Sequence, residues 1–168
     1  MKKIVSILFI TFLSFASNLL AEDSKSIKRI SEGEENAKIT IIAYESLTCG
    51  HCADFHKNVY PDLKKNFIEK GLVKIEFRHF PLDIAAFNAS KVGQCRNDGK
   101  SDLMHTLFTG QKKWAKGNTP EQANDYLKKF LKDEGIIVDL EKCLNDKIIE
   151  DYVLNAVSYT HLTLPTKR

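Results

Sequence analysis

The amino-acid sequence predicts an α/β fold in which a strand-helix-strand unit is followed by a helical subdomain. Residues 38–44 form an apolar run of strand length, and residues 53–67 carry apolar side chains at helical spacing. Residues 73–78 then alternate between apolar and charged side chains, and helix signals continue from there to residue 156. With 43% hydrophobic residues and no low-complexity tract, the chain has the composition of one compact globular domain.

The N-terminus has the layout of a secretory signal peptide, which we place at residues 1–21. Two lysines precede an apolar run from Ile4 to Phe15, which is too short for a transmembrane helix. Cleavage after Ala16 fits the small-x-small rule, whereas Ala21 marks the start of the polar segment. An uncleaved membrane anchor is the alternative. We expect export to the periplasm without stable membrane insertion, because an oxidising compartment suits four cysteines.

The charge balance gives no indication of a nucleic-acid partner. The whole chain carries a net charge of +3, from 25 basic and 22 acidic residues. Four of the basic residues lie in the predicted signal peptide or at the last two positions of the chain, so residues 22–156 retain 21 basic and 22 acidic residues, a net charge of −1. A nearly neutral domain lacks the electrostatic footprint of nucleic-acid binding.

The first strand is expected at residues 38–44, where both faces are mostly apolar, as in a central strand covered on two sides. A helix follows, with Pro61 expected to kink or restart it, and its apolar face comprises Phe55, Val59, Leu63 and Phe67. The second strand is expected from Val73 and ends before Pro81. The intervening helix favours a parallel, right-handed crossover.

The sequence Cys49-Gly50-His51-Cys52 lies where the first strand gives way to the helix pattern that begins at Ala53. Free N–H groups and the positive end of the helix dipole favour a thiolate on the first cysteine, and such positions lower a thiol pKa from about 8.5 into the range of roughly 3.5 to 7.5. Cys49 is therefore the candidate nucleophile and Cys52 the candidate resolving thiol. We expect His51 to stabilise the Cys49 thiolate by a hydrogen bond or by charge, which would make the disulfide more oxidising.

Two other uses of the cysteine pair can be weighed on physical grounds. A disulfide that closes only two intervening residues restricts the unfolded chain very little and is a poor structural staple. A metal ion would find three ligands in Cys49, Cys52 and His56, but no fourth ligand is apparent, because Cys95 and Cys143 lie alone in separate helix-like segments. We favour redox chemistry, which needs no bound cofactor, and keep a metal-binding or metal-delivery module as the alternative.

The remaining segment carries several helix start and stop signals. Ser101 is expected to cap a helix whose apolar face comprises Leu103, Met104, Leu107, Phe108 and Trp114. Residues 119–122, Thr-Pro-Glu-Gln, have the form of a capping box, and Gly135 is expected to end that helix. Asp139 is expected to start another helix. The side chains of this helix expected to face the interior are Leu140, Cys143, Leu144, Ile148, Tyr152 and Val153.

With these features the chain resembles the thioredoxin-fold disulfide oxidoreductases of the DsbA type. The resemblance covers about residues 35–156 and rests on three stretches: Ala43 to His56 with its C-G-H-C centre, Phe77 to Leu82, and Val92 to Trp114. It implies a thioredoxin-like fold with an inserted helical subdomain. It also implies an exported enzyme that exchanges disulfides with cysteine-containing exported proteins and that is served by a membrane redox partner.

The resemblance also assigns roles to individual cysteines. It implies that Cys49 carries the mixed disulfide and that Cys52 resolves it. DsbA has proline where this chain has Gly50, and C-G-H-C is also the centre of protein disulfide isomerase, so oxidation and isomerisation both remain open. Relatives with cysteines in the two corresponding helices imply that Cys95 and Cys143 can pair as a structural disulfide; the alternative is two small buried hydrophobic residues.

The resemblance divides the chain into an N-terminal β-α-β part at residues 22–84 and a helical insertion at residues 85–156. A thioredoxin fold would then require a cis-proline loop, two further strands and a final helix, which the remaining residues do not supply. The codons expected for residues 157–166 resemble a transposon-end sequencing adapter, so we expect residues 157–168 to be an artefact and the domain to be a fragment. Exposed strand edges and apolar faces would then favour poor solubility or association. A genuine short tail is the alternative.

Overall fold

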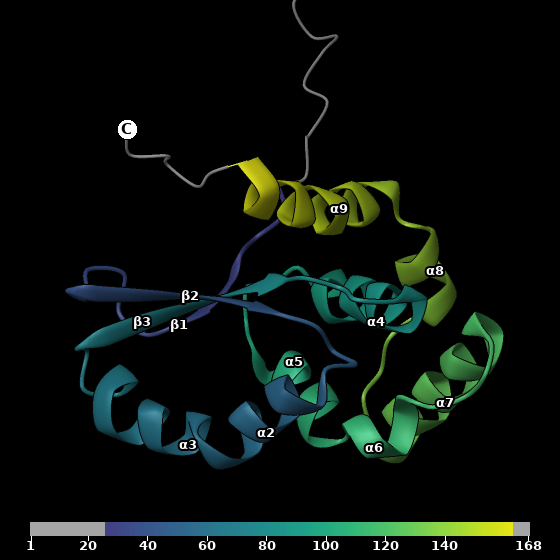
Figure 1. Cartoon of the computed structure of the whole chain (residues 1–168), viewed down its shortest axis with the longest axis horizontal. Coiled ribbons are helices and arrows are strands. Elements are labelled where there is room, and N and C mark those ends of the chain that lie inside the picture. Colours follow the sequence, from purple (N-terminus) through teal and green to yellow (C-terminus); the bar gives the residue numbers. More distant parts are fainter. Residues whose placement is uncertain (1–25, 163–168) are drawn as a thin grey trace, which may run out of the picture.

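A computed structural model of the chain describes residues 26–162 and the side chains of residues 26–157. The predicted signal peptide lies outside the described residues, as do residues 163–168. A three-stranded sheet is covered by helices on two sides, and a further group of helices extends from one end of it (Figure 1). No helix in this described range is long and apolar enough to cross a membrane.

The elements follow the expected order of a β-α-β unit and then helices. The strands are β1 (Ile30–Glu32), β2 (Ile39–Glu45) and β3 (Val73–His79). The connection from β2 to β3 contains α2 (Gly50–Asn58), α3 (Tyr60–Leu63) and a π-helical segment (Lys64–Ile68). After β3 come α4 (Ile84–Cys95), α5 (Asp102–Thr109), α6 (Gln111–Trp114), α7 (Pro120–Asp133), α8 (Leu140–Asn145) and α9 (Lys147–Leu162).

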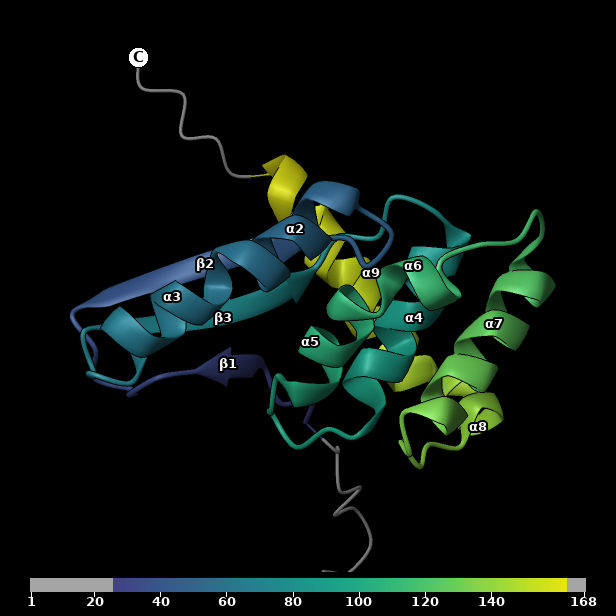
Figure 2. The same ribbon diagram turned by 90° about the horizontal axis from the view of Figure 1, so that it is seen from below.

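Strand β3 is the middle strand of the described sheet, whose order is β1-β3-β2 (Figure 2). Strand β2 runs parallel to β3, with Ile39 opposite Val73 at one end and Glu45 opposite His79 at the other, which confirms the predicted parallel unit. Strand β1 lies antiparallel on the other side of β3. The sequence analysis missed β1 because three residues are too few to show an alternating pattern.

The prediction that residues 38–44 form a strand covered on both sides is wrong. Among the described strands β2 pairs with β3 alone, and three of its side chains are exposed by 57%, 46% and 38%, namely Ile39, Ile42 and Tyr44. The covered strand is β3, which buries Glu76 together with its apolar residues. Glu76 tolerates burial because its carboxylate pairs with Arg78 at 2.7 Å and with Arg29 at 3.6 Å. The partner Arg29 lies far away in sequence, so the alternation could not reveal this compensation.

Most of the predicted helix boundaries are confirmed. Helix α3 restarts with Pro61 in its first turn. The Thr119 hydroxyl accepts a hydrogen bond from the backbone N–H of Gln122 at 3.3 Å and so caps α7, and Gly135 follows that helix with a φ of +70°. Asp139 caps α8 in the same way. The predicted apolar face of α5 and α6 is buried as expected: Leu103, Met104, Leu107, Phe108 and Trp114.

Two predictions about helix details are wrong. The Ser101 side chain does not cap α5, because its hydroxyl donates a hydrogen bond to the Glu32 carboxylate instead. Ile148 is 54% exposed, and Ile149 is buried in its place. The reason is that Asp146 separates α8 from α9 and accepts hydrogen bonds from the N–H groups of both isoleucines, so the two helices do not share one periodicity.

A disulfide between Cys95 and Cys143 joins the end of α4 to α8, with the two Cα atoms 5.5 Å apart. The same helices are held by Lys91, whose ammonium group donates to the backbone carbonyl of Leu144 and pairs with Glu150 of α9 at 3.0 Å. Helix α4 is therefore joined to α8 by the disulfide and to α9 by the ion pair.

We predict that the double variant Cys95→Ala/Cys143→Ala loses up to about 4 kcal/mol of unfolding free energy, because the disulfide closes a loop across 48 residues of sequence. Urea denaturation followed by circular dichroism measures the loss. The matched control is Cys49→Ala/Cys52→Ala, which removes the pair that encloses two residues and therefore constrains the unfolded chain far less. Equal midpoints for the first variant and the parent chain would contradict the prediction.

His79, at the end of β3, is a buried histidine that lacks full hydrogen bonding. Its Nε2 atom lies 3.3 Å from Oε1 of Gln94, whereas Nδ1 has no hydrogen-bond partner. Burial lowers the pKa of His79 from 6.5 to about 4, although the contact with Gln94 acts in the opposite direction. The folded chain therefore keeps this imidazole neutral at pH values where the unfolded chain protonates it.

We predict that this histidine makes the fold acid-labile. Its contribution to stability is fully present above pH 6.5, and up to about 3 kcal/mol is lost as the pH falls to about 4, because only the unfolded chain binds the proton in that window. Urea denaturation at a series of pH values tests this. In His79→Gln the slope over this window should be smaller, whereas His51→Gln, which changes an exposed histidine, should keep the slope of the parent chain.

Candidate active site

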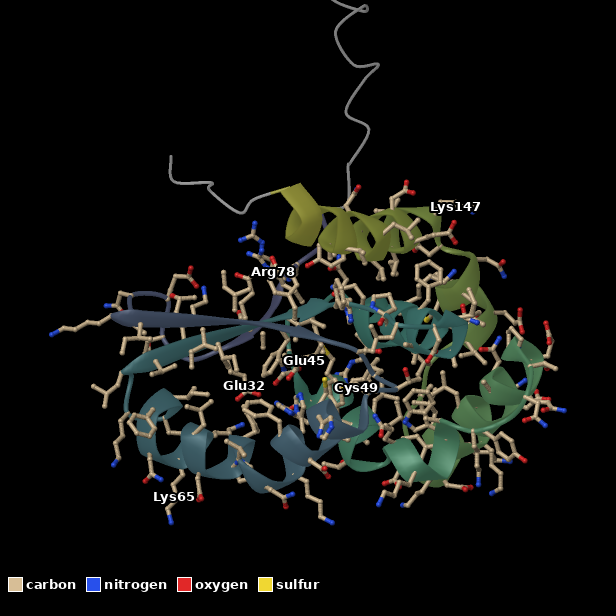
Figure 3. The ribbon with its side chains drawn as sticks, viewed as in Figure 1. Glu32, Glu45, Cys49, Lys65, Arg78 and Lys147 are labelled. Atoms are coloured by element: carbon tan, nitrogen blue, oxygen red, sulfur yellow. A yellow bond between two sulfur atoms is a disulfide. The ribbon has the colours of Figure 1, made fainter. Side chains whose placement is uncertain are left out.

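The cysteine pair lies where β2 leads into α2. Cys49 is the residue before the first residue of α2, and its backbone N–H donates to the carbonyl of Ser46 at 3.0 Å. Cys52 lies within the first turn of the helix. Both thiols are free and partly exposed. Figure 3 places Cys49 on the same side of the sheet as α2, close to Glu45 at the end of β2.

The two thiols differ in acidity. Burial raises the pKa of Cys49, but hydrogen bonds from the Cys52 thiol and from the backbone N–H groups of Cys52 and His51 outweigh this effect and the repulsion from Glu45, so the pKa is lowered overall. The pKa of Cys52 is raised to about 11, first by burial and then by the hydrogen bond that it donates to Cys49. This arrangement favours a thiolate at Cys49 and a protonated thiol at Cys52, as expected of a nucleophile and its resolving partner.

The other two residues of the motif contribute through the backbone. The His51 side chain is exposed and makes no hydrogen bond or ion pair within the described part of the chain; its backbone N–H contributes to Cys49 instead of the expected imidazole. A Cβ atom at Gly50 would meet nothing within 4 Å. Neither the available space nor a positive φ therefore requires a glycine at this position.

The loop that carries Cys49 is held by the helical subdomain. The buried Gln111 side chain of α6 donates hydrogen bonds from Nε2 to the carbonyls of Leu47 and Cys49, at 2.8 and 2.9 Å. The Thr48 hydroxyl donates to Asp83 at 2.7 Å, and the same carboxylate caps α4. The sequence analysis missed Gln111 because a single glutamine in a short helix belongs to no motif.

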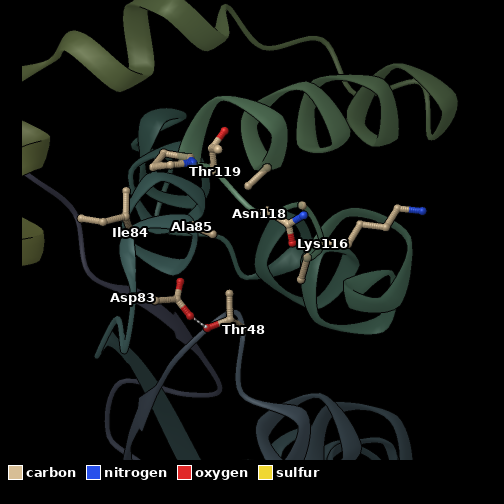
Figure 4. A pocket seen from close by; sticks show the side chains of 11 residues that line it. Thr48, Asp83, Ile84, Ala85, Lys116, Asn118 and Thr119 are labelled. Atoms are coloured by element: carbon tan, nitrogen blue, oxygen red, sulfur yellow. Dashed lines mark hydrogen bonds between the residues drawn. The ribbon is translucent and has the colours of Figure 1, made fainter.

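A pocket of about 320 Å³ opens beside the contact between Thr48 and Asp83 (Figure 4). Its wall combines the start of α4 with the segment that leads from α6 into α7, and includes Ile84, Lys116, Asn118 and Thr119. The pocket is formed jointly by the β-α-β part and the helical subdomain, and Thr48 in its wall is the residue that directly precedes Cys49.

A chain of hydrogen-bonded polar side chains begins at Glu45, beneath the cysteine pair. Oε2 of Glu45 lies 2.8 Å from Nε2 of His56, and Nδ1 of His56 lies 2.6 Å from Nδ1 of His105. Nε2 of His105 lies 3.0 Å from Oε1 of Glu32. The ring of His56 also stacks on Phe108, with centroids 4.0 Å apart. The sequence analysis missed this series of hydrogen-bonded side chains, because its members come from four separate elements.

Glu32 is held as a carboxylate at the far end of this series of hydrogen-bonded side chains. Burial raises its pKa, but hydrogen bonds from His105, Ser101 and Tyr60 and the ammonium group of Lys64 at 2.9 Å hold it well below its usual range. The pKa of the Tyr60 hydroxyl is raised, first by burial and then by its hydrogen bond to Glu32. Strand β1 is thereby fastened to the helices beneath the sheet.

The geometry does not favour the metal-binding alternative. Both ring nitrogens of His56 are engaged, one with Glu45 and the other with His105, so this histidine is not a ligand beside Cys49 and Cys52. Within residues 26–162, no group of three or more His, Cys, Asp and Glu side chains is placed to hold a metal ion.

Comparison with known proteins gives consistent results. A protein-family model described as thioredoxin matches residues 25–161. The "Putative protein-disulfide oxidoreductase" of Rickettsia bellii is 29% identical over 131 residues, which cover 73% of this chain and 48% of that protein. The protein of the same description from Rickettsia felis is 28% identical and is covered to 45%. The chain thus spans about half the length of these curated relatives.

Solved structures share the architecture. The crystal structure of Wolbachia pipientis alpha-DsbA1 is 29% identical, with a TM-score of 0.68 over 81% of this chain and 71% of that chain. The protein-disulfide isomerase from Novosphingobium aromaticivorans has a TM-score of 0.72 at 16% identity, over 85% of this chain and 84% of that chain, which is a likeness of fold alone.

We predict that Cys52→Ala raises the pKa of Cys49, because it removes the thiol that donates a hydrogen bond to the Cys49 sulfur. Cys52→Ser retains a donor and should raise it less. The pH dependence of alkylation by iodoacetamide gives the Cys49 pKa in each variant. The reciprocal variant, Cys49→Ala, reports on Cys52 alone, which should react only in alkaline solution. Equal Cys49 pKa values in the alanine and serine variants would contradict the contribution of this hydrogen bond.

Proposed function

The chain belongs to the thioredoxin family, and on this premise we propose that it is a DsbA-type thiol:disulfide oxidoreductase acting on exported proteins. The expected thioredoxin-like fold is confirmed by the family match and by the solved structures. The observation that carries the proposal is the free cysteine pair at the start of α2, in which the pKa of Cys49 is lowered and that of Cys52 raised. The apolar N-terminal segment, residues 1–21, supports export to the periplasm.

In the oxidising direction, a substrate thiolate attacks the Cys49 sulfur of the Cys49–Cys52 disulfide. The bond between the two cysteines breaks, Cys52 leaves with the electron pair, and a mixed disulfide forms between Cys49 and the substrate. A second substrate thiolate then attacks the substrate sulfur and releases Cys49 as a thiolate. The substrate dithiol is oxidised to a disulfide and the enzyme disulfide is reduced to a dithiol, so electrons pass between sulfur atoms only.

The acidity of Cys49 supports this direction. A thiol of low pKa is the better leaving group, so the second attack readily expels Cys49 and completes the substrate disulfide. The pocket beside Thr48 offers room for a substrate side chain at the loop that carries Cys49. Renewal of the enzyme disulfide would then fall to a membrane redox partner.

We predict that the oxidised parent chain restores activity to reduced, unfolded ribonuclease A, and that Cys49→Ser abolishes this activity. Mixed with scrambled, disulfide-bonded ribonuclease A, Cys52→Ser should instead accumulate a mixed disulfide, because Cys49 attacks a substrate disulfide and releases a substrate thiolate, and no thiol at position 52 resolves the product. Non-reducing electrophoresis and mass spectrometry locate the linkage. If Cys52→Ser traps no mixed disulfide and the parent chain restores no ribonuclease activity, the proposal is refuted. Zinc or copper retained stoichiometrically through gel filtration would favour the metal-binding alternative.

A further inference from the structure

A pocket of about 300 Å³ lies on the face of the sheet opposite to the cysteine pair. It is formed between β3 and α9, and its wall includes Arg29, Glu76, Arg78 and Tyr152. Figure 3 shows Arg78 on the side of the sheet that faces α9, whereas Cys49 lies on the side that faces α2. The residues of this pocket therefore take no part in the sulfur chemistry described above.

The pairing of β1 with β3 brings two arginines together in this wall. Ile30 lies opposite Phe77 in the antiparallel register. Arg29, one position before β1, therefore comes next to Arg78, one position further along β3. Both guanidinium groups contact one carboxylate, that of Glu76: Nε of Arg78 lies 2.7 Å from Oε1, and Nη1 of Arg29 lies 3.6 Å from Oε2.

The charges of this cluster do not cancel. Glu76 is the only carboxylate that pairs with either arginine within the described part of the chain, so two positive charges face one negative charge. The Glu76 side chain is buried, whereas the Arg29 side chain is 68% exposed. Like charges at neighbouring positions of paired strands repel each other. A second anion on the exposed side of the cluster would therefore be stabilised.

Arg78 and Tyr152 define the shape of the pocket. Nη1 of Arg78 donates to the Tyr44 hydroxyl at 2.8 Å, and the guanidinium group lies over the Tyr44 ring, 5.5 Å from its centroid. These contacts fix the plane of the guanidinium group. Burial and the charge of Glu76 raise the pKa of Tyr152, whereas Arg29 and Arg78 lower it without cancelling the rise. The Tyr152 hydroxyl on α9 is therefore a neutral donor beside both arginines.

This set of donors suits a phosphate group. A guanidinium group presents several N–H donors in a planar fork, which binds oxyanions through two hydrogen bonds at once. A phosphate monoester carries a charge of about −1.5 to −2 near pH 7, so the positive surplus attracts it more strongly than it attracts a carboxylate. The pocket also has room for a small organic group beyond the phosphate, against Ala156 and the ring of Tyr152.

We propose that this pocket binds the phosphate group of a small organic phosphate, with Arg29 and Arg78 on its oxygens and the Tyr152 hydroxyl as a further donor. Glu76 does not contact the ligand and holds the two guanidinium groups in position. The phosphate can come from a soluble ester or from the headgroup of a phospholipid, since the contacts with the arginines are the same. The proposal does not rest on the proposed function, because the pocket and the cysteines occupy opposite faces of the sheet.

Titration of the isotope-labelled chain with glycerol phosphate, followed by nuclear magnetic resonance at pH 7 and constant ionic strength, tests the site. The Nε–H signals of Arg29 and Arg78 should shift and saturate. The signal of Arg96 should stay in place, because this arginine lies outside the pocket and pairs with Asp98 at 3.1 Å. If the signals of Arg29 and Arg78 do not move at up to about 10 mM ester, the proposal is overturned.

We predict that Arg29→Gln weakens the binding of glycerol phosphate by at least about tenfold, because it removes a charged donor from the ligand. Arg78 keeps its contact with Glu76 in this variant, so the buried carboxylate stays paired. Arg96→Gln is the matched control. It removes the same charge from an exposed arginine elsewhere and should change the dissociation constant by less than about twofold. Equal weakening by the two variants would indicate attraction to surface charge alone and would overturn the pocket.

A second variant and a second ligand complete the test. Tyr152→Phe keeps the ring and removes the hydroxyl, so it should weaken binding by about threefold or more. An unchanged dissociation constant in both Arg29→Gln and Tyr152→Phe overturns the proposal. Monomeric dihexanoyl phosphatidic acid carries the same phosphate on a lipid. Binding at least about tenfold tighter than that of glycerol phosphate, and lost in Arg29→Gln, assigns the site to a phospholipid headgroup, whereas equal binding assigns it to a soluble ester.

Discussion

The partly buried Glu32 carboxylate constrains how the sheet and the helices fit together. A carboxylate withdrawn from water must be matched by donors, and Glu32 obtains them from residues 28, 32, 69 and 73 positions further along the chain, namely Tyr60, Lys64, Ser101 and His105. These residues belong to α3, the π-helical segment, the start of α5 and α5 itself. Short strand β1 therefore cannot shift without breaking contacts to α3, the π-helical segment and α5.

The loop with Cys49 depends on a similar junction between distant parts. Gln111 binds two of its carbonyls from the helical subdomain, and Asp83 binds Thr48 from the start of α4. Both contacts hold the loop in the conformation that directs the N–H groups of α2 toward the Cys49 sulfur. The helical subdomain therefore shapes the reactivity of a thiol that belongs to the β-α-β part.

Local signals in the sequence predicted the strands and helix of the β-α-β unit, the cysteine pair and most helix caps, because each of these depends on residues within one or two turns of each other. The parallel pairing of the two strands followed from the helix between them. The polar chain could not be predicted in this way, since its links join residues separated by 11, 49 and 73 positions. The same limit explains the error at β2, whose exposure depends on which strands pair with it, and the error at Ile148, which depends on the break at Asp146.

The difference between the two thiols arises from geometry rather than from charge alone. The Glu45 carboxylate raises the pKa of Cys49 and of Cys52 alike, so it cannot by itself distinguish them. The N–H groups at the start of α2 favour the thiolate of Cys49, which precedes the helix, whereas Cys52 is held within its first turn and donates its own proton toward Cys49. A buried negative charge is tolerable here because His56 binds it directly, and its cost to Cys49 is outweighed by the helix start. Burial and the hydrogen bond to Cys49 leave Cys52 with a raised pKa, so its proton must be moved for every disulfide that opens or closes.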